Sequence, residues 1–232
     1  FLSACVIPHL YHVIQGGRYQ RQAGSHFNPH TYDDIKTIAD HAHYTGNIRE
    51  HAFWGENRVT RPASALDTSM LGGGHAHCGL AIYNGGVFPD RYYGDLLFHN
   101  LHGHRLVRER VDREGSGYVG RHRPDFALAR DHNEIGVGVM VGPDGAIYTS
   151  DWHDPQTCHH GDPEIWDRTD GRIFRIRYGE VRPYQFDLWA ESDAQLIERL
   201  KSDNGFFARQ ASRILHERAS LGQLNRELVE SR

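Results

Sequence analysis

The most constraining feature of this sequence is a pattern of short apolar strands that occurs twice. Each copy has three apolar runs that are separated by turns rich in glycine and proline. The runs of the first copy are 79–83, 95–99 and 104–111, and those of the second copy are 136–141, 146–150 and 171–178. Short strands that recur at the spacing of one blade are typical of a β-propeller. The sequence therefore predicts a mainly β fold, the C-terminal part of a propeller.

The predicted strand order places most of the metal-capable side chains at one face. In a propeller blade, the loop before the first strand and the loop after the second strand lie on the same side. These loops contain His75 and His77, Asp131–Glu134, the cluster His99, His102 and His104, Asp151–Asp154 and Cys158–His160. Of the 18 histidines in the chain, only His216 lies beyond residue 160, so the histidine enrichment belongs to the β part.

The C-terminal part of the chain has the hydrophobic period of helices. Ser192-x-x-Gln195 has the spacing of a capping box and predicts the start of one helix. A second helix is expected after Asp203-Asn-Gly205, and Ser220-x-x-Gln223 predicts a third. The second helix carries one apolar stripe: Phe207, Ala211, Ile214 and Leu215. Two such helices resemble one HEAT-type unit. We therefore expect a partial propeller at 1–182 and the start of HEAT-type helical repeats at 187–232.

One further short helix is predicted upstream of the repeat, from residue 31 to residue 42. Thr31 has the position of an N-cap, and acidic residues follow in the first turn. Ile35, Ile38 and Ala42 share one stripe of that helix.

Composition argues against two classes of function. The formal net charge of −4 shows no basic excess, so a nucleic-acid-binding face is not expected. No apolar run reaches the roughly 18 residues of a membrane-spanning helix, so no transmembrane segment is expected. Because the chain starts at Phe1 in the middle of a strand-like pattern, we interpret it as a fragment. The lack of a signal peptide then says nothing about export.

The histidines around the first copy of the repeat form a candidate metal site. His75 and His77 are two residues apart, and this spacing in extended chain puts both imidazoles on one side. Neutral imidazole is a ligand for zinc, copper or iron. The alternative is that these side chains bond the loop backbone. The predicted metal ligands are His75, His77, His102, His104 and Asp151.

Asp151-Trp152-His153-Asp154 has the equivalent position in the second copy, and three roles remain open for it. Asp151 and Asp154 have the oxygen ligands that calcium prefers. Asp151 and His153 have the chemistry of an acid/base pair. The third role is the capping of the turn by aspartate side chains. The predicted catalytic residues are His75, His77, Asp151 and His153, and the metal stays undecided between calcium, copper and zinc. Cys158–His160 would offer soft ligands, and a Cys78–Cys158 pair remains open.

Motifs along almost the whole chain carry a family resemblance. Gly79-Leu-Ala-Ile-Tyr83, Gly142-Pro-Asp-Gly145 and Gly171-Arg-Ile-Phe-Arg-Ile176 resemble the glucose/sorbosone dehydrogenase family, a six-bladed propeller of quinoprotein sugar dehydrogenases. Gly72-Gly-Gly-His-Ala-His77 and Cys158-His-His160 resemble the "membrane-bound dehydrogenase domain" proteins of Planctomycetes. In that group, HEAT repeats follow the propeller, often with a haem-binding CxxCH cytochrome domain. The resemblance implies a dehydrogenase-like protein of the periplasm or cell envelope.

One departure from the family concerns its cofactor. In the quinone-using enzymes, the strand before the Gly-Pro-Asp-Gly turn carries arginines that pair with the carboxylates of pyrroloquinoline quinone. The matching residues here are Val137 and Met140. Each charge-assisted bond lost would remove roughly 1.5–3 kcal/mol. The sequence therefore argues against quinone binding at this place.

Two functions remain open at this point. The first is a propeller oxidoreductase that acts on a sugar or polyol and passes electrons to a haem domain outside this chain. The alternative is a non-catalytic propeller/HEAT scaffold that binds glycans or proteins. The dense histidine and aspartate face favours the enzyme, whereas Val137 and Met140 favour the scaffold.

Overall fold

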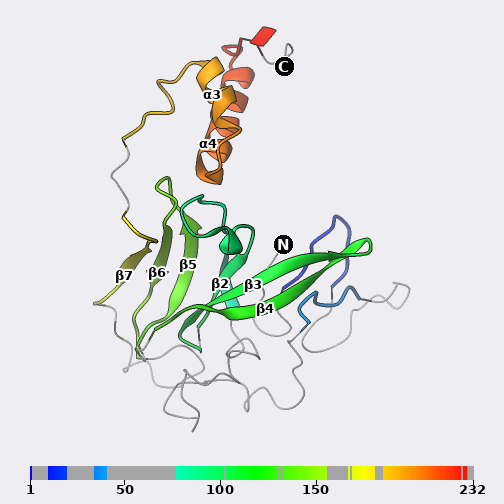
Figure 1. The fold of residues 1–232 in the computed structure, drawn as a ribbon, viewed down its shortest axis with the longest axis vertical. Coiled ribbons are helices and arrows are strands. Elements are labelled where there is room, and N and C mark those ends of the chain that lie inside the picture. The colour runs from blue at the N-terminus through cyan, green and yellow to red at the C-terminus, as the bar shows by residue number, and fades with distance from the viewer. Residues whose placement is uncertain are drawn as a thin grey trace. The chain divides into compact units, whose positions relative to one another are not determined.

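The fold was determined as a computed structural model, and Figure 1 shows its elements. The structure describes residues 1, 10–19, 34–40, 77–101, 103–129, 131, 133–155, 167, 169–180, 185–225 and 227–228. Its strands are β1 (His77–Ile82), β2 (Leu96–Asn100), β3 (Arg105–Glu114), β4 (Gly117–Leu128), β5 (Gly136–Val141), β6 (Ile147–Asp151) and β7 (Arg172–Ile176). Its helices are the short 3-10 helix η1 (Asp90–Tyr92), α3 (Asp193–Arg199) and α4 (Gly205–Ser220).

The first sheet has four antiparallel strands in the order β1-β2-β3-β4. Its central strands are apolar on one face, and this face forms a core of Leu96, Phe98 and Val107 with Leu10 and Ala39. The alternate residues Leu97 and His99 point to the other face and are also buried. Both faces of β2 are therefore covered.

The second sheet has three strands in the order β5-β6-β7. The predicted turn at Gly142–Gly145 joins β5 to β6, with a hydrogen bond from Gly142 N to Ala146 O of 2.9 Å. Gly145 has a φ of +71°, which favours glycine there. The predicted mainly β fold is confirmed, with two antiparallel sheets. Closure into a propeller stays a prediction.

The two sheets approach each other closely along β1 and β5. Cys78 Sγ donates to Gly136 O at 3.3 Å. A Cβ at Gly79 would lie 2.6 Å from Val137 O, and the φ of Gly79 is +63°. Glycine is therefore required at this contact, because any side chain would meet backbone of the other sheet.

The predicted helix at residues 31–42 is wrong for the part that the structure describes. Ile35 forms an isolated parallel bridge with Tyr19, and Ala39 forms one with Gly120. Ile38 donates its N–H to Leu10 O at 3.1 Å and accepts from Gly120 N at 2.7 Å. These long-range backbone bonds take the donors and acceptors that a helix would have used, and so override the local pattern.

The helical prediction is confirmed at two points. Ser192 and Gln195 form both hydrogen bonds of a capping box at the start of α3. The apolar stripe of α4, namely Phe207, Ala211, Ile214 and Leu215, is buried against Leu188 and Leu196. The third helix is not opened by Ser220, which lies in the last turn of α4 and donates to Glu217 O at 2.8 Å. A HEAT-type repeat stays a prediction.

The chain divides into two compact units. The first comprises 1–82, 94–140 and 148–174, and the second comprises 83–93, 141–147 and 175–232. In the second unit, the N-cap residue of α4 joins the helices to the turns. Asn204 Nδ2 donates to Gly142 O at 3.1 Å and to Pro143 O at 2.9 Å. Within the described residues, no helix has both the length and the apolar character needed to cross a membrane.

Candidate functional site

Polar side chains gather in the first unit at the ends of strands where β1 and β5 begin and β2 and β6 end. Antiparallel pairing brings these ends together, since the start of one strand lies beside the end of its neighbour. The residues concerned are His77, His99, Asn100, His104, Asp131, Glu134, Asp151, His153 and Arg172. His104 joins the two sheets here, because its Nδ1 donates to Glu134 O at 2.6 Å.

Asp151 organises the turn that follows β6. Its Oδ1 accepts from Ile135 N at 2.7 Å and from His153 N at 2.8 Å. Its Oδ2 accepts from Arg172 Nε at 2.7 Å. The carboxylate is 3 % exposed, so charge-assisted hydrogen bonds hold it rigidly. Of the three roles that the sequence left open for Asp151, turn capping is the one that these bonds perform.

The same turn occurs in the first sheet, at the matching position of the repeat. Asn100 is the last residue of β2, as Asp151 is the last residue of β6. Asn100 Oδ1 accepts from Gly103 N at 2.9 Å. The side-chain cap is therefore common to both copies, and a charged residue occupies it in the second copy only.

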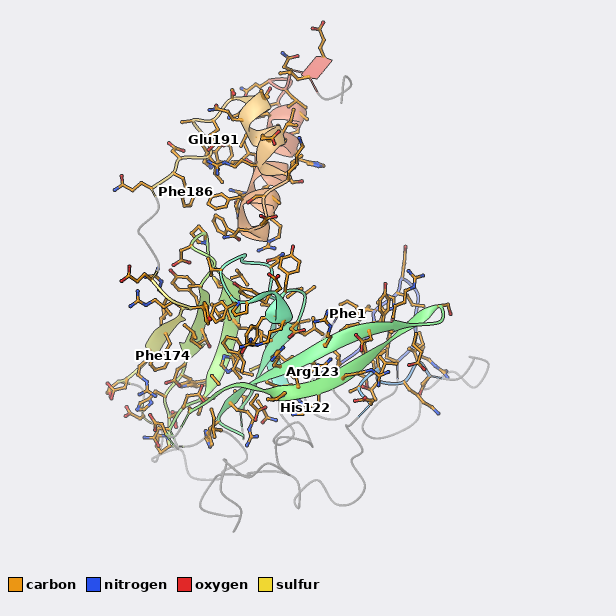
Figure 2. The ribbon with its side chains drawn as sticks, viewed as in Figure 1. Phe1, His122, Arg123, Phe174, Phe186 and Glu191 are labelled. Carbon is orange, nitrogen blue, oxygen red and sulfur yellow. The ribbon has the colours of Figure 1, made fainter. Side chains whose placement is uncertain are left out.

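Arg172 links the start of β7 to two carboxylates. Its Nη2 donates to Asp131 Oδ2 at 2.9 Å, and its Nε donates to Asp151. The backbone N–H of Asn133 and the Arg172 guanidinium lower the pKa of Asp131. Arg172 also lies over the ring of Phe174, which Figure 2 labels, at 5.1 Å. The guanidinium therefore bridges the two carboxylates.

His153 faces the same carboxylates from the turn itself. Its Nδ1 lies 3.5 Å from Asp151 Oδ2 and 3.8 Å from Asp131 Oδ2. Its φ of +59° is uncommon for a residue with a side chain. The bonds of Asp151 and the bond from Asp154 N to Asn133 O of 2.9 Å hold the backbone in this conformation.

Glu134 is the buried acid of the site. It is 7 % exposed, and its Oε2 is buried without a hydrogen-bond partner. Burial, and after it the negative charge of Asp151, raises the pKa of Glu134 to about 7. A carboxyl group with a pKa near neutrality can hold and release a proton under physiological conditions.

His99 is a buried imidazole beside Glu134. Its Nε2 forms a short hydrogen bond with Thr149 Oγ1 of β6. Its Nδ1 lies 3.9 Å from Glu134 Oε1. Burial lowers the pKa of His99 to about 4, so the imidazole is neutral at pH 7. The ring occupies the space of a missing side chain, because a Cβ at Gly136 would overlap with Nδ1.

The structure brings together some of the predicted site residues. His104 donates to the backbone oxygen of Glu134, and Asp151 accepts from the N–H of the next residue, Ile135. His153 lies beside Asp151. His77 lies on β1, where Asn100 Nδ2 donates to its Nε2 at 3.1 Å. His75, His102 and Cys158–His160 lie outside the described residues.

The two predicted cofactor types, a metal ion and a quinone, need different side chains. Among the described side chains, no group of three or more histidine, cysteine, aspartate or glutamate residues has the arrangement of a metal site. The metal site therefore stays a prediction. Val137 and Met140 are 40 % and 65 % exposed on β5 and have no side-chain donor for a carboxylate. These two positions do not fit a tricarboxylate quinone.

Sequence reasoning did not select Glu134 as a functional residue. The sequence predicts that Asp131–Glu134 is a loop of the site-bearing face, and this position is the available signal. Nothing in the local pattern distinguishes Glu134 from Asp131. The difference arises from burial, because Asp131 is reached by Arg172 whereas Glu134 points toward His99.

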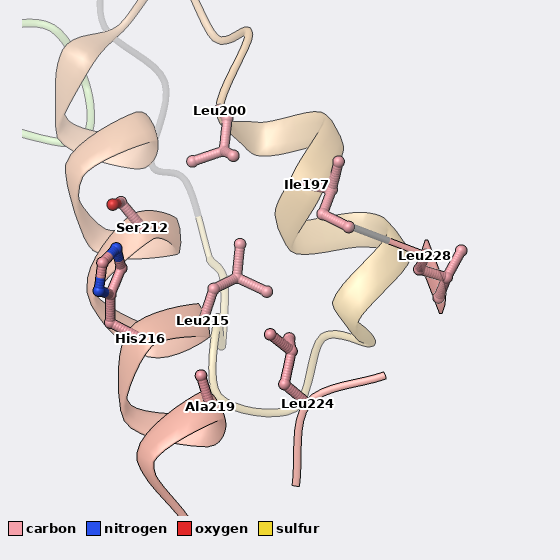
Figure 3. Close-up of a pocket in the computed structure, with 8 residues that line it drawn as sticks. All are labelled: Ile197, Leu200, Ser212, Leu215, His216, Ala219, Leu224 and Leu228. Carbon is pink, nitrogen blue, oxygen red and sulfur yellow. The ribbon is translucent and has the colours of Figure 1, made fainter. Parts of the chain in front are cut away.

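The helical part of the chain contains an apolar pocket, which lacks comparable chemistry. Its volume is about 430 Å³, and residues lining it include Ile197, Leu215 and Leu224 (Figure 3). His216 is the one titratable side chain among its lining residues. The strand ends of the first unit are therefore the better candidate for a reactive site.

Comparison with known proteins gives one family match. The model of the family described as "Domain of unknown function (DUF7133)" matches residues 8–180. No curated protein matches the chain. Among solved structures, a protein from Thermus thermophilus that is described as an oxidoreductase (glucose dehydrogenase) is similar, with 18 % identity and a TM-score of 0.30. The match covers 54 % of this chain and 31 % of that one, so it spans about a third of the other protein. A likeness of this size carries no argument about function.

Proposed function

Because the chain belongs to the DUF7133 family, whose description assigns no activity, we propose a function from its own residues. We propose that it forms part of an oxidoreductase that oxidises a hydroxyl group of a sugar or polyol. Glu134 is the proton acceptor in this proposal. The observation that carries it is a buried carboxyl group whose pKa is about 7, at the end of strands where several polar side chains meet.

The chemistry assigned to Glu134 is general base catalysis. As a carboxylate it takes the proton of the substrate hydroxyl while the hydrogen on the same carbon leaves with two electrons. A pKa near the working pH favours this role, because the group is partly ionised and still basic. The carbon–oxygen bond becomes a carbonyl, and the hydrogen leaves as a hydride to a two-electron, hydride-accepting redox cofactor, which the described residues do not supply. The family resemblance implies that a haem domain outside this chain finally receives the electrons.

The neighbouring side chains have supporting roles in this proposal. Asp151, held by Arg172 and two backbone N–H groups, keeps a negative charge near Glu134 and so raises its pKa. His153 keeps part of its surface accessible, with a side chain that is 16 % exposed, and offers a hydrogen bond to a substrate hydroxyl. The sugar or polyol class and the cell-envelope location rest on the sequence resemblance.

A second candidate is the non-catalytic scaffold. It is favoured by Trp152, which is 61 % exposed on the turn after β6, and by the apolar Val137 and Met140. An exposed indole on a turn fixed by hydrogen bonds is suited to stacking on a sugar ring. In this case the protein binds glycans and transfers no electrons.

The test is an oxidation assay with a panel of sugars and polyols and ferricyanide as electron acceptor. We expect turnover with at least one substrate in the wild-type protein. Glu134→Gln should lower kcat by about 10²–10⁴-fold, the usual contribution of a general base. The matched control is Asp90→Asn in η1, which leaves the site unchanged. Glycan binding without turnover on any substrate would favour the scaffold.

A further inference from the structure

We infer that His99 is a positioning residue for Glu134: the carboxyl group rotates to form a hydrogen bond with Nδ1, and this bond holds it in a reactive orientation. The inference deepens the proposed function and rests on it for the reaction, although its structural part stands without turnover. The positioning unit consists of Thr149, His99 and Glu134, which lie on β6, on β2 and just before β5.

The imidazole of His99 is fixed in its orientation. The His99 ring is 2 % exposed, and its Nε2 is fixed by the short hydrogen bond to Thr149 Oγ1. This bond fixes the ring, and the second nitrogen, Nδ1, then lies 3.9 Å from Glu134 Oε1. Gly136 leaves the room for the ring, because a Cβ there would overlap with Nδ1.

The imidazole of His99 and the carboxyl group of Glu134 each have a buried polar atom without a partner. His99 Nδ1 and Glu134 Oε2 are both buried and make no hydrogen bond, and Nδ1 lies 3.9 Å from Glu134 Oε1. A rotation of the carboxyl group that brings Oε2 within hydrogen-bond distance of Nδ1 would satisfy both atoms. Leaving a buried donor or acceptor unsatisfied is costly, so the contact is favoured.

The other charged groups around Glu134 have partners of their own. The charged neighbours are Asp151 from β6, Arg172 from β7 and Asp131 from the loop before β5. His104, just before β3, contacts the backbone of Glu134, and His153 lies beside Asp131 and Asp151. Arg172 is engaged by Asp131 and Asp151, and the His104 Nδ1 donates to the backbone oxygen of Glu134. Among the described residues, His99 is therefore the imidazole directed at the side-chain carboxyl.

The experiment tests the roles of the two ring nitrogens of His99 with different variants. His99→Asn keeps a polar atom near the place of Nδ1 and loses the link to Thr149. His99→Gln keeps one near the place of Nε2 and loses the contact with Glu134. Thr149→Val removes the fixing bond without altering the ring, and it remains informative if a His99 variant fails to fold.

The first readout is the infrared carbonyl band of protonated Glu134, identified as the band that Glu134→Gln removes. We expect His99→Gln to shift this band to higher frequency, because the carboxyl loses its hydrogen bond, and His99→Asn to shift it less. The second readout is turnover. His99→Gln should lower kcat by about 100-fold with little change in KM, as expected when a reacting group is misplaced by about 1 Å.

An unchanged carbonyl band in His99→Gln and Thr149→Val would overturn the inference. Equal band frequencies in His99→Asn and His99→Gln would overturn it as well. If the ring only filled space, it would not matter which of the two nitrogens the variant replaces. A shifted band in a protein that oxidises no hydroxyl substrate would leave the inference standing and sink the proposed function instead.

Discussion

His99 Nδ1 and Glu134 Oε1 lie 3.9 Å apart, although one residue belongs to the first sheet and the other precedes the second. Burial lowers the pKa of His99 to about 4 and raises that of Glu134 to about 7. In the unfolded chain at about pH 5.5, the imidazole is charged and the carboxyl ionised. Folding therefore moves one proton from the imidazole to the carboxyl, and a neutral pair is buried in place of an ion pair.

The first prediction concerns stability and pH. The pKa of Glu134 is raised from 4.5 in the unfolded chain to about 7 in the folded protein. Protonation of Glu134 therefore favours the folded protein fully below about pH 4.5, and this contribution is lost as pH rises through about 7. The shift from 4.5 to about 7 corresponds to about 3 kcal/mol. Gln cannot ionise, so Glu134→Gln removes the cost of a buried carboxylate at high pH. Relative to wild type, the free energy of unfolding of the variant should be higher at about pH 8 than at about pH 5. Urea unfolding at both pH values measures the difference, and equal effects would contradict the prediction.

The second prediction concerns Gly136. Gly136→Ala places a methyl group where it overlaps with His99 Nδ1, so the ring or the strand must move. We expect a loss of about 1–3 kcal/mol, as for other overpacked sites. Gly171→Ala is the matched control, since its Cβ would meet Asp151 O at 3.9 Å in ordinary contact. Thermal unfolding of both variants tests this, and equal melting temperatures would be the opposing result.

The third prediction concerns the charge of Asp151. This charge raises the pKa of Glu134, so Asp151→Asn should lower that pKa below about 7. The substitution keeps an oxygen for Ile135 N and His153 N and removes the charge opposite Arg172. The pKa of Glu134 is measured by pH titration of its carbonyl carbon in NMR. Asp90→Asn serves as the control, and no change in Asp151→Asn would disprove the electrostatic coupling.

The fourth prediction concerns the helical pair. Ile214 is 1 % exposed in the core formed with Leu196 and Phe207. Ile214→Asp buries an unpaired charge and should cost several kcal/mol, about 3–5. Arg209→Asp changes charge at an exposed position of the same helix and should cost far less. Circular dichroism melts follow both variants, and an unchanged Ile214→Asp melt would exclude a packed pair.

The fifth prediction concerns pyrroloquinoline quinone. Val137 and Met140 have no side-chain donor for its carboxylates, so we expect no binding in the micromolar range. Calorimetric titration of the protein with the quinone is the measurement, with a quinone-dependent dehydrogenase titrated in parallel. Saturable micromolar binding would show that other residues hold the cofactor.

The elements that could be predicted from the sequence are those set by local patterns. The strands of the repeat, the Gly142–Gly145 turn, the Ser192 capping box and the Ile214 stripe depend on neighbouring residues. Residues 34–40 were predicted wrongly, because their backbone pairs with Leu10 and Gly120, which are distant in the sequence. Such pairing leaves no periodic signal.

The candidate site also contains features that the sequence predicts and one that it does not. The loops that carry Asp151, His153 and His104 could be assigned to one end of the strands from the strand order. The role of Glu134 could not, since its pKa depends on burial and on the charge of Asp151 at the end of another strand. Aspartate capping of a turn is a local feature, whereas burial of an acid between two sheets arises only from the tertiary fold.

The central claim is that Glu134 carries a proton at neutral pH, and titration of its side-chain carbonyl carbon by NMR tests it most directly. Glutamate-labelled protein is titrated, and the Glu134 signal is assigned as the one that Glu134→Gln removes. The account predicts a midpoint of about 7. A midpoint near the ordinary value of about 4.5 would contradict it, because Glu134 would then be ionised at neutral pH like any exposed glutamate.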